Sequence, residues 1–361
     1  MTERFTATYH VRSDAASIEA RAQGIAVEQS VEMPLAGIDE PAVLSDIVGD
    51  VEAIEDLGDG TFAVRIGLAL ATVGDDPGQL LNMLFGNTSL HEDVILRDAI
   101  IPERFRPGSE IGTPVLRRLL DVPERAFTGS ALKPQGLAPE RLAALAERFA
   151  QGGLDFIKDD HGLADQGYSR FAVRVPMIAD SVARAARSTG HKTRYIPSLT
   201  GDLDQLRAQA NIARDSGLDC MMVAPMVSGF SSIRTLIRAF PEVTFFAHPS
   251  MGGAARIAPA LLIGKLFPAL GCGAVIFPTY GGRFGYSRAT CQELAANARP
   301  ALAVPAGGIT LNRVGELLDF YGPDTMLLIG GNLLLARDRI TEESAAFVRA
   351  VAQHGDISHG Y

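Results

Sequence analysis

The segment Gly152-Gly153-Leu154-Asp155-Phe156-Ile157-Lys158-Asp159-Asp160-His161 is an apolar run that ends in a lysine, two carboxylates and an imidazole. Successive side chains of a β-strand point to opposite faces, so Lys158 and Asp160 share the face of Phe156, and Asp159 takes the other. A strand that begins apolar and ends in such groups is typical of the C-terminal rim of a (β/α)8 barrel, where active sites lie. A solvated, charged turn after a buried strand is the alternative that this segment alone leaves open.

Short apolar runs that end in Gly, Pro or polar residues recur from residue 126 onward, and an amphipathic helical pattern follows each of them. The eight runs are Phe127–Lys133, Leu154–Asp160, Tyr195–Thr200, Cys220–Met226, Thr244–His248, Ala274–Pro278, Ala301–Gly308 and Met326–Gly331. Alternation of strands and helices predicts parallel strands, and eight of them predict closure into a barrel. The first helix begins near Pro139 and carries an apolar stripe at Leu142, Leu145, Ala146 and Phe149.

The N-terminal part has a different pattern. It predicts a strand at 5–10, a helix at 15–26, an extended polar segment at 28–32, a hairpin at 51–68 around Asp59-Gly60, and a helix at 77–85. Several Pro and Gly residues between 102 and 120 predict a connection between domains. The fold class is therefore α/β, with a smaller N-terminal α+β domain at 1–120 and a C-terminal (β/α)8 TIM barrel at 121–361.

Composition narrows the range of functions. The chain has 361 residues, a net charge of −9 and no basic cluster, so nucleic acid is not an expected partner. Its three cysteines are widely spaced and form no CxxC pair, which argues against a cysteine zinc site and fits a reducing cytoplasm. Residues 1–5 contain no apolar signal region and no apolar run reaches bilayer-spanning length, so no membrane partner is expected.

Barrel enzymes place their sites at the carboxyl ends of the strands, so the polar and glycine residues at these ends are the candidates. They are Lys133, Lys158, Asp160, His161, His248, Arg283, and the glycine pairs Gly307-Gly308 and Gly330-Gly331. Glycine pairs after the seventh and eighth strands can bring main-chain N–H groups close to a phosphate, although a lone pair is usually only a turn.

Two of these segments are similar to a known family. Ala131-Leu132-Lys133-Pro134-Gln135-Gly136-Leu137 resembles the Lys-Pro segment of the RuBisCO large subunit at its first barrel strand. Residues 152–160 are very close to that family's Gly-Gly-Leu-Asp-Phe-x-Lys-Asp-Asp signature. The resemblance runs from about residue 5 to 352, and the chain looks most like the RuBisCO-like proteins of form IV, which do not fix carbon dioxide.

The resemblance implies roles for the candidates. Lys158 would take up carbon dioxide to become a carbamate and would bind Mg2+ together with Asp160 and position 161, His161 in this chain. A carbamate turns a cation into an oxygen ligand, which Mg2+ prefers. Lys133 would move protons, His248 would lie near the substrate, and the four glycines would hold a phosphate. No organic cofactor is expected.

The chain also departs from the carboxylating enzymes of the family. His161 stands in place of a glutamate, Gln135 in place of a second lysine, and Pro249 in place of a phosphate-binding arginine. Ile276 and Phe277 occupy the strand end where a second active-site histidine is expected, while Arg283 can stand in for the lysine of the following loop. These losses indicate a substrate with one phosphate and argue against carbon dioxide fixation.

The resemblance then favours metal-dependent enolisation or isomerisation of a monophosphorylated ketose, with 5-methylthioribulose 1-phosphate isomerase of methionine and sulfur salvage as the expected activity. A decarboxylase or transcarboxylase-hydrolase acting on a phosphorylated branched sugar acid is the alternative on the same scaffold. A non-catalytic sugar-phosphate sensor is a further alternative, which the altered metal position would fit.

Two N-terminal segments carry the expectation about assembly. Val27-Glu28-Gln29-Ser30 and Phe85-Gly86-Asn87 resemble the segments that this family lends to a neighbouring subunit's site. The resemblance implies a homodimer with shared active sites, in which Glu28 and Asn87 of one chain complete the barrel site of the other. Helix capping is the alternative explanation of Asn87.

Overall fold

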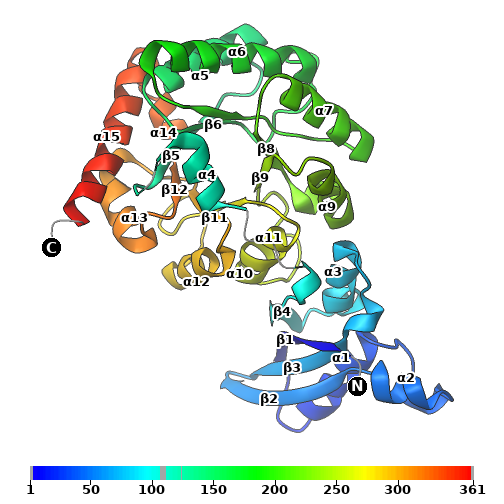
Figure 1. Cartoon of the computed structure of the whole chain (residues 1–361). Helices are drawn as coiled ribbons and strands as arrows, with labels where there is room; N and C mark the ends of the chain where they lie inside the picture. Colours follow the sequence, from blue (N-terminus) through cyan, green and yellow to red (C-terminus); the bar gives the residue numbers. More distant parts are fainter. Residues whose placement is uncertain (1–2, 106–110, 123, 359–361) are drawn as a thin grey trace. The chain divides into compact units, whose positions relative to one another are not determined.

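The computed structural model describes residues 3–105, 111–122 and 124–358 and divides the chain into two compact units (Figure 1). The first unit comprises Met1–Arg106 together with Met251–Leu270, and the second comprises Pro107–Ser250 together with Gly271–Tyr361. The fold is α/β, with a C-terminal (β/α)8 barrel and a smaller N-terminal α+β part, which confirms the predicted fold class.

The first unit is built on a four-stranded antiparallel sheet with the strand order β2-β3-β1-β4. Strand β1 alternates buried and half-exposed residues, and its Tyr9 hydroxyl donates a hydrogen bond to the Leu84 carbonyl at the end of α3, at 2.7 Å. The elements are β1 (Arg4–Arg12), α1 (Ile18–Glu28), α2 (Pro41–Asp46), β2 (Asp50–Gly58), β3 (Thr61–Ala69), α3 (Pro77–Phe85) and β4 (Val94–Ala99). The sequence patterns predicted most of these elements, but not α2 or β4.

A segment from much later in the chain completes this unit. The Leu96 N–H of β4 donates to the Arg256 carbonyl at 3.0 Å, and the Ala258 N–H donates back to the Leu96 carbonyl at 2.9 Å. The Lys265 ammonium forms an ion pair with Asp98 at 2.6 Å. The segment continues as one apolar, buried helical stretch, made of α10 (Pro259–Leu261), a π-helical turn (Leu262–Leu266) and α11 (Phe267–Ala269).

The described residues of the second unit form eight parallel strands in the order of the chain. Two four-stranded sheets, β12-β5-β6-β7 and β11-β10-β9-β8, are joined by the Ser198–Met222 bridge and the Ala303–Thr325 bridge, which closes the barrel. The strands are β5 (Phe127–Leu132), β6 (Phe156–Asp159), β7 (Arg194–Ile196), β8 (Cys220–Val223), β9 (Thr244–Ala247), β10 (Ala274–Pro278), β11 (Leu302–Ala306) and β12 (Met326–Leu328). Seven of these strands lie within the runs predicted from the sequence, and β7 begins one residue before its run.

Helices surround the strands, as Figure 1 shows for α5, α6, α7 and α15. They are α4 (Thr113–Leu120), α5 (Pro139–Gln151), α6 (Phe171–Thr189), α7 (Leu203–Asp215), α8 (Pro225–Ser228), α9 (Phe230–Ala239), α12 (Arg288–Ala298), α13 (Val314–Tyr321), α14 (Gly331–Leu334) and α15 (Ile340–Ser358). Within the described part of the chain, no helix is both long and apolar enough to cross a lipid bilayer.

The barrel interior is a packed apolar core, because alternate residues of each strand point inward. Phe156 lies near its centre, with its ring centroid 5.6 Å from those of both Phe127 and Phe246. Leu116 and Leu120 of α4 belong to the same core cluster. For that reason α4 is part of the barrel unit, although the Pro and Gly residues of 102–120 predict a connection there. Residues 106–110 of that connection lie outside the described residues.

A buried ion pair fixes the start of β6. The Asp155 carboxylate has no exposed surface and receives hydrogen bonds from the Arg125 guanidinium at 2.7 and 2.8 Å. It also accepts from the main-chain N–H and the hydroxyl of Thr128 on β5, at 2.8 and 2.9 Å. Burial alone would raise the pKa of Asp155, but the hydrogen bonds and charge of Arg125 keep it below its ordinary value.

Replacement of Arg125 should therefore destabilise the barrel. Arg125→Met leaves the Asp155 carboxylate buried without its main partner, and the loss in free energy of unfolding should be about 3–5 kcal/mol at neutral pH. Because the pKa of Asp155 is depressed in the folded state, its contribution to stability is lost as the pH falls, so the difference from wild type should narrow in acid. Urea denaturation at several pH values measures both effects.

The matched control is Arg184→Met, which removes a partly exposed ion pair with Glu147 on the barrel surface. Its cost should be at most about 1 kcal/mol. Equal losses for the two variants would contradict a special role for the buried pair.

Candidate active site

Strands β5 and β6 bring the predicted polar residues together at the carboxyl ends of the strands, hereafter the barrel mouth. Ala131 of β5 pairs with Lys158 of β6, so Lys133 emerges from the same face two residues later. The Lys133 ammonium lies 2.8 Å from Oδ1 of Asp160. Lys133 is also close to the strand-eight turn, because its Cε lies 4.0 Å from the position that a Cβ on Gly330 would occupy.

Lys158 is almost fully buried beneath this pair, at 3% exposure, and its ammonium donates to the Asp159 carbonyl at 2.7 Å. Burial, together with the positive charge of Lys133, lowers the pKa of Lys158 to about 8, although Asp160 and Asp159 oppose the shift. An amine with a pKa of about 8 is neutral in roughly a tenth of the molecules at pH 7, and the neutral amine is the form that reacts with carbon dioxide.

Asp160 is the common acceptor of the site. Its Oδ1 also lies 3.3 Å from Nδ1 of His161, whose side chain is half exposed. Burial would raise the pKa of Asp160, but the hydrogen bonds from His161 and Lys133 and the charges of the two lysines hold it well below the ordinary carboxyl range. Asp160 is therefore a carboxylate at physiological pH.

The two histidines of the site stack face to face. The rings of His161 and His248 lie 4.5 Å apart with an interplanar angle of 7°. His248 Nδ1 accepts a hydrogen bond from the Ser250 main-chain N–H at 3.2 Å, so the proton of the neutral ring is on Nε2. Burial and the positive charges of Lys158 and His161 lower the pKa of His248 to about 2, which makes it a neutral hydrogen-bond donor rather than an acid.

These residues fit a magnesium site only if Lys158 is modified. The described residues contain no cluster of three or more His, Cys, Asp or Glu side chains suited to a metal ion. Asp160 and His161, which lie in hydrogen-bond contact at 3.3 Å, would supply two ligands, and a carbamate on Lys158 would supply a third from the strand face of Asp160. The carbamate and Asp160 would offer the oxygen ligands that Mg2+ prefers, whereas the His161 imidazole is a poorer ligand for this ion.

A buried network behind β6 holds this arrangement in place, and sequence reasoning did not find its members. The Asp159 carboxylate points away from the mouth and accepts from Arg174 of α6 at 3.2 Å and from the Tyr195 hydroxyl of β7 at 2.7 Å. The Ser198 N–H donates to the same carboxylate at 3.1 Å. Burial and the neighbouring Asp159 raise the pKa of Tyr195 well above its ordinary value, so its hydroxyl remains a donor.

The glycine pairs lie at the ends of β11 and β12, as the sequence predicted. Gly307 and Gly308 have φ angles of +84° and +110°, which residues other than glycine rarely adopt. The Asn332 amide links the two turns by donating to the Ile309 carbonyl at 2.7 Å. Arg283 lies in the loop after β10, where its main-chain N–H donates to the Gly307 carbonyl at 2.9 Å.

Glu28 and Asn87, predicted to serve a neighbouring subunit, lie together in the first unit. The Asn87 amide donates to the Glu28 carboxylate at 2.9 Å and to the Glu32 carboxylate at 2.7 Å. The sequence did not single out Glu32, because residues 28–32 were expected to be extended. Instead Glu28 ends α1, and Glu32 follows a tight turn with a φ of +55°.

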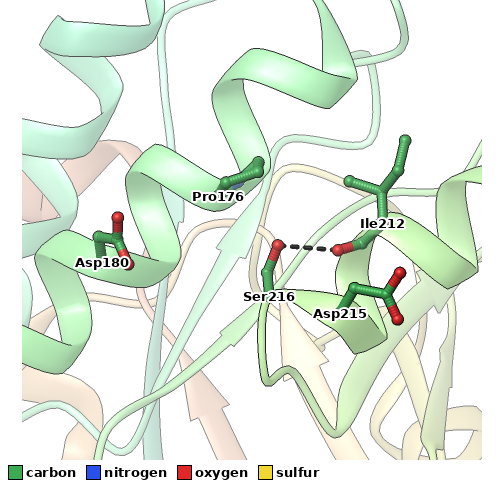
Figure 2. A pocket seen from close by; sticks show the side chains of 5 residues that line it. All are labelled: Pro176, Asp180, Ile212, Asp215 and Ser216. Carbon is green, nitrogen blue, oxygen red and sulfur yellow. Dashed lines mark hydrogen bonds between the residues drawn. The ribbon is translucent and has the colours of Figure 1, made fainter.

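A separate surface pocket of about 410 Å³ lies between α6 and α7, where it is lined by Pro176, Asp180, Ile212, Asp215 and Ser216 (Figure 2). The Ser216 hydroxyl donates a hydrogen bond to the Ile212 carbonyl at 2.8 Å. None of the candidate residues lines this pocket, so it plays no part in the chemistry of the barrel mouth.

Comparison with known proteins finds relatives along nearly the whole chain. Residues 112–259 match the family model described as the ribulose bisphosphate carboxylase large chain, catalytic domain. The chain is 56% identical to the 5-methylthioribulose-1-phosphate isomerase of Rhodospirillum rubrum, over 100% of this chain and 99% of that one. It is 28% identical to the 2,3-diketo-5-methylthiopentyl-1-phosphate enolase of Bacillus licheniformis, over 91% and 86% of the two chains.

Among solved structures, the RuBisCO-like protein of Rhodopseudomonas palustris superposes with a TM-score of 0.92 and 46% identity, and the match covers 98% of this chain and 99% of that one. Fold and mouth residues thus define a barrel protein of the RuBisCO large-chain superfamily. Within it, the chain belongs to the RuBisCO-like proteins, the non-carboxylating form IV branch.

The geometry of Lys158 predicts that metal binding depends on carbon dioxide. Titration with Mn2+ as a probe for Mg2+, followed by electron paramagnetic resonance, should show tighter binding when bicarbonate is present. Lys158→Ala should abolish this gain while circular dichroism remains that of the wild type. Lys192→Ala, which changes an exposed lysine, is the control and should behave as wild type. Equal Mn2+ affinity with and without bicarbonate would contradict the carbamate.

Proposed function

We propose that this RuBisCO-like enzyme catalyses metal-dependent α-proton transfer on a monophosphorylated ketose, and specifically the isomerisation of 5-methylthioribulose 1-phosphate. The observation that supports it most directly is the convergence of Lys133, Lys158 and Asp160 at one barrel mouth. The 56% identity to an isomerase of that name, over nearly the full length of both chains, supports the particular substrate.

Each residue of the mouth has a role in this proposal. Lys158 as a carbamate, Asp160 and His161 would hold Mg2+, which when bound would polarise a carbonyl or enolate oxygen of the substrate. Lys133 would accept the α-proton on Nζ as the neutral amine, and its position at the same mouth, 2.8 Å from Asp160, supports this role. His248 positions the substrate by donating a hydrogen bond from Nε2.

The phosphate is proposed to lie at the glycine pairs Gly307-Gly308 and Gly330-Gly331, hereafter the phosphate cradle, with Arg283 supplying charge from the β10 loop. Two features support a single phosphate. Pro249 has no charge to offer a second one, and the buried Phe277 points outward to pack against Tyr321, with ring centroids 6.0 Å apart.

An enolase that acts on 2,3-diketo-5-methylthiopentyl 1-phosphate is the second candidate, because a relative at 28% identity carries that name. Both reactions begin with removal of a proton next to a carbonyl. Incubation of the enzyme with each substrate in D2O, followed by proton NMR, separates the two reactions. Only the true substrate should give a new product that contains solvent deuterium. Exchange with neither substrate would overturn the proposed function.

Lys133→Met should lower the rate of proton exchange and of turnover by at least about two orders of magnitude, which is the usual scale for the loss of a general base. Since the methionine keeps the length of the side chain, substrate binding should change much less than the rate. Deuterium incorporation and turnover measured on the same sample check this. A variant with near-normal exchange would assign the proton transfer to another group.

We further propose a cytoplasmic homodimer in which Glu28 and Asn87 of one chain complete the mouth of the other. The exposed Glu28–Asn87–Glu32 cluster supports this, since it places two carboxylates around one amide on a surface. Solved RuBisCO structures with this fold include oligomers, among them a dimeric archaeal RuBisCO from Hyperthermus butylicus. The three buried, free cysteines fit a reducing compartment.

Co-expression of two inactive variants tests the shared site. Glu28→Ala and Lys158→Ala should each have little activity alone, whereas their purified heterodimer should regain part of it, because one of its two sites is intact. Differently tagged subunits allow the heterodimer to be isolated before turnover is measured. No activity in the isolated heterodimer would place each site within one chain.

A further inference from the structure

The loop after β10 and the turn after β11 are held together by their main chains. The β10 loop comprises residues 279–287 and carries Arg283. The Thr279 N–H donates to the Ala306 carbonyl, and the Arg283 N–H donates to the Gly307 carbonyl, both at 2.9 Å. The position of the loop is therefore coupled to the position of Gly307.

The contact between loop and turn is closer than side chains would permit. A Cβ on Gly282 would lie 2.1 Å from the Gly307 carbonyl oxygen, and a Cβ on Gly308 would lie 3.0 Å from the Gly282 Cα. The glycines of the turn thus have two effects. They leave the main-chain N–H groups uncovered by side chains, and they leave space for the main chain of the loop. Any shift of the loop base changes the shape of the turn.

Arg313 holds the base of this loop. Its guanidinium donates to the carbonyls of Tyr280 and Gly281, at 3.3 and 3.4 Å. It is also paired with Glu316 at 3.1 Å, and Glu316 accepts a hydrogen bond from the Tyr280 hydroxyl at 2.8 Å. One ion pair therefore ties both the main chain and the side chain at the loop base to α13.

Arg288 provides an internal comparison. Its guanidinium lies over the rings of Tyr280 and Phe320, at 4.5 and 4.6 Å from their centroids, and 3.9 Å from Glu316. Arg288 and Arg313 both contact the Tyr280 ring and Glu316. Only the Arg313 guanidinium lies against Gly281, 3.4 Å from the position that a Cβ on that glycine would occupy. Of these two arginines, Arg313 is the one that donates to the main chain of the loop.

We propose that Arg313 is a positioning residue for phosphate binding: by fixing Tyr280 and Gly281, it sets the β10 loop against Gly307 and Gly308. This rests on the phosphate cradle of the proposed function. Arg313 itself does not touch the substrate. It acts through the loop main chain, and Glu316 holds its guanidinium in the necessary orientation.

The test compares Arg313→Gln with Arg288→Gln in the full-length enzyme. Hydrogen–deuterium exchange of peptides covering residues 279–287 should be faster in Arg313→Gln, because the loop base has lost its two charge-assisted hydrogen bonds. Calorimetric titration with inorganic phosphate should show affinity weakened about tenfold, the equivalent of one such hydrogen bond. Arg288→Gln should leave both quantities near those of the wild type.

Kinetics distinguish positioning from general damage. Arg313→Gln should raise KM for the phosphorylated substrate with kcat nearly unchanged, and Arg313→Lys should recover part of the phosphate affinity. Unchanged exchange in Arg313→Gln, or faster exchange with unchanged phosphate affinity, would overturn the inference while leaving the proposed reaction intact. A wild-type enzyme that isomerises its substrate but binds no inorganic phosphate would overturn the phosphate cradle and this inference with it.

Discussion

Asp159 accepts hydrogen bonds from Arg174, Tyr195 and the Ser198 N–H in the layer between strands and helices, where water has no access. Without such partners, the buried carboxylate would lower the free energy of unfolding by several kcal/mol, as an unpaired buried ion does. This network therefore fixes the register of β6. Because strand side chains alternate, Lys158 and Asp160 must then face the barrel interior, and a slip of one residue would reverse every one of them.

The electrostatics of the mouth follow from that register. Two amines, Lys133 and Lys158, face one carboxylate, Asp160, and the positive charge of Lys133 contributes to the lowered pKa of Lys158. A carbamate on Lys158 would replace a cation with an anion, so the two lysine positions would change from mutual repulsion to attraction. In the proposed carbamate form, burial and the charge of Lys133 favour the modification, whereas the charges of Asp160 and Asp159 oppose it.

How much of this could be predicted from sequence depends on whether a residue's role is local. Strand alternation and terminal polar groups were sufficient to place Lys158, Asp160 and Asp159 on the correct faces, and glycine pairs marked the turns after β11 and β12. The roles of Arg174 and Arg313 depend on partners 15 and 33 residues away, which no short pattern encodes. Glu32 was missed because its role depends on a left-handed backbone angle, and β4 because a late segment supplies one of its neighbours.

That late segment has a consequence for how the protein is made. The last strand of the first unit's sheet, β4, ends at residue 99. Its Leu96 nevertheless pairs with Ile257, and its Asp98 forms an ion pair with Lys265. At roughly 5–20 residues per second, a ribosome needs on the order of ten seconds or more to reach these partners. During that interval the nascent N-terminal unit carries an open sheet edge, which is the kind of surface that chaperones bind and that neighbouring chains on a polysome can pair with. Translation order, and not only equilibrium stability, therefore bears on whether this chain folds without aggregating.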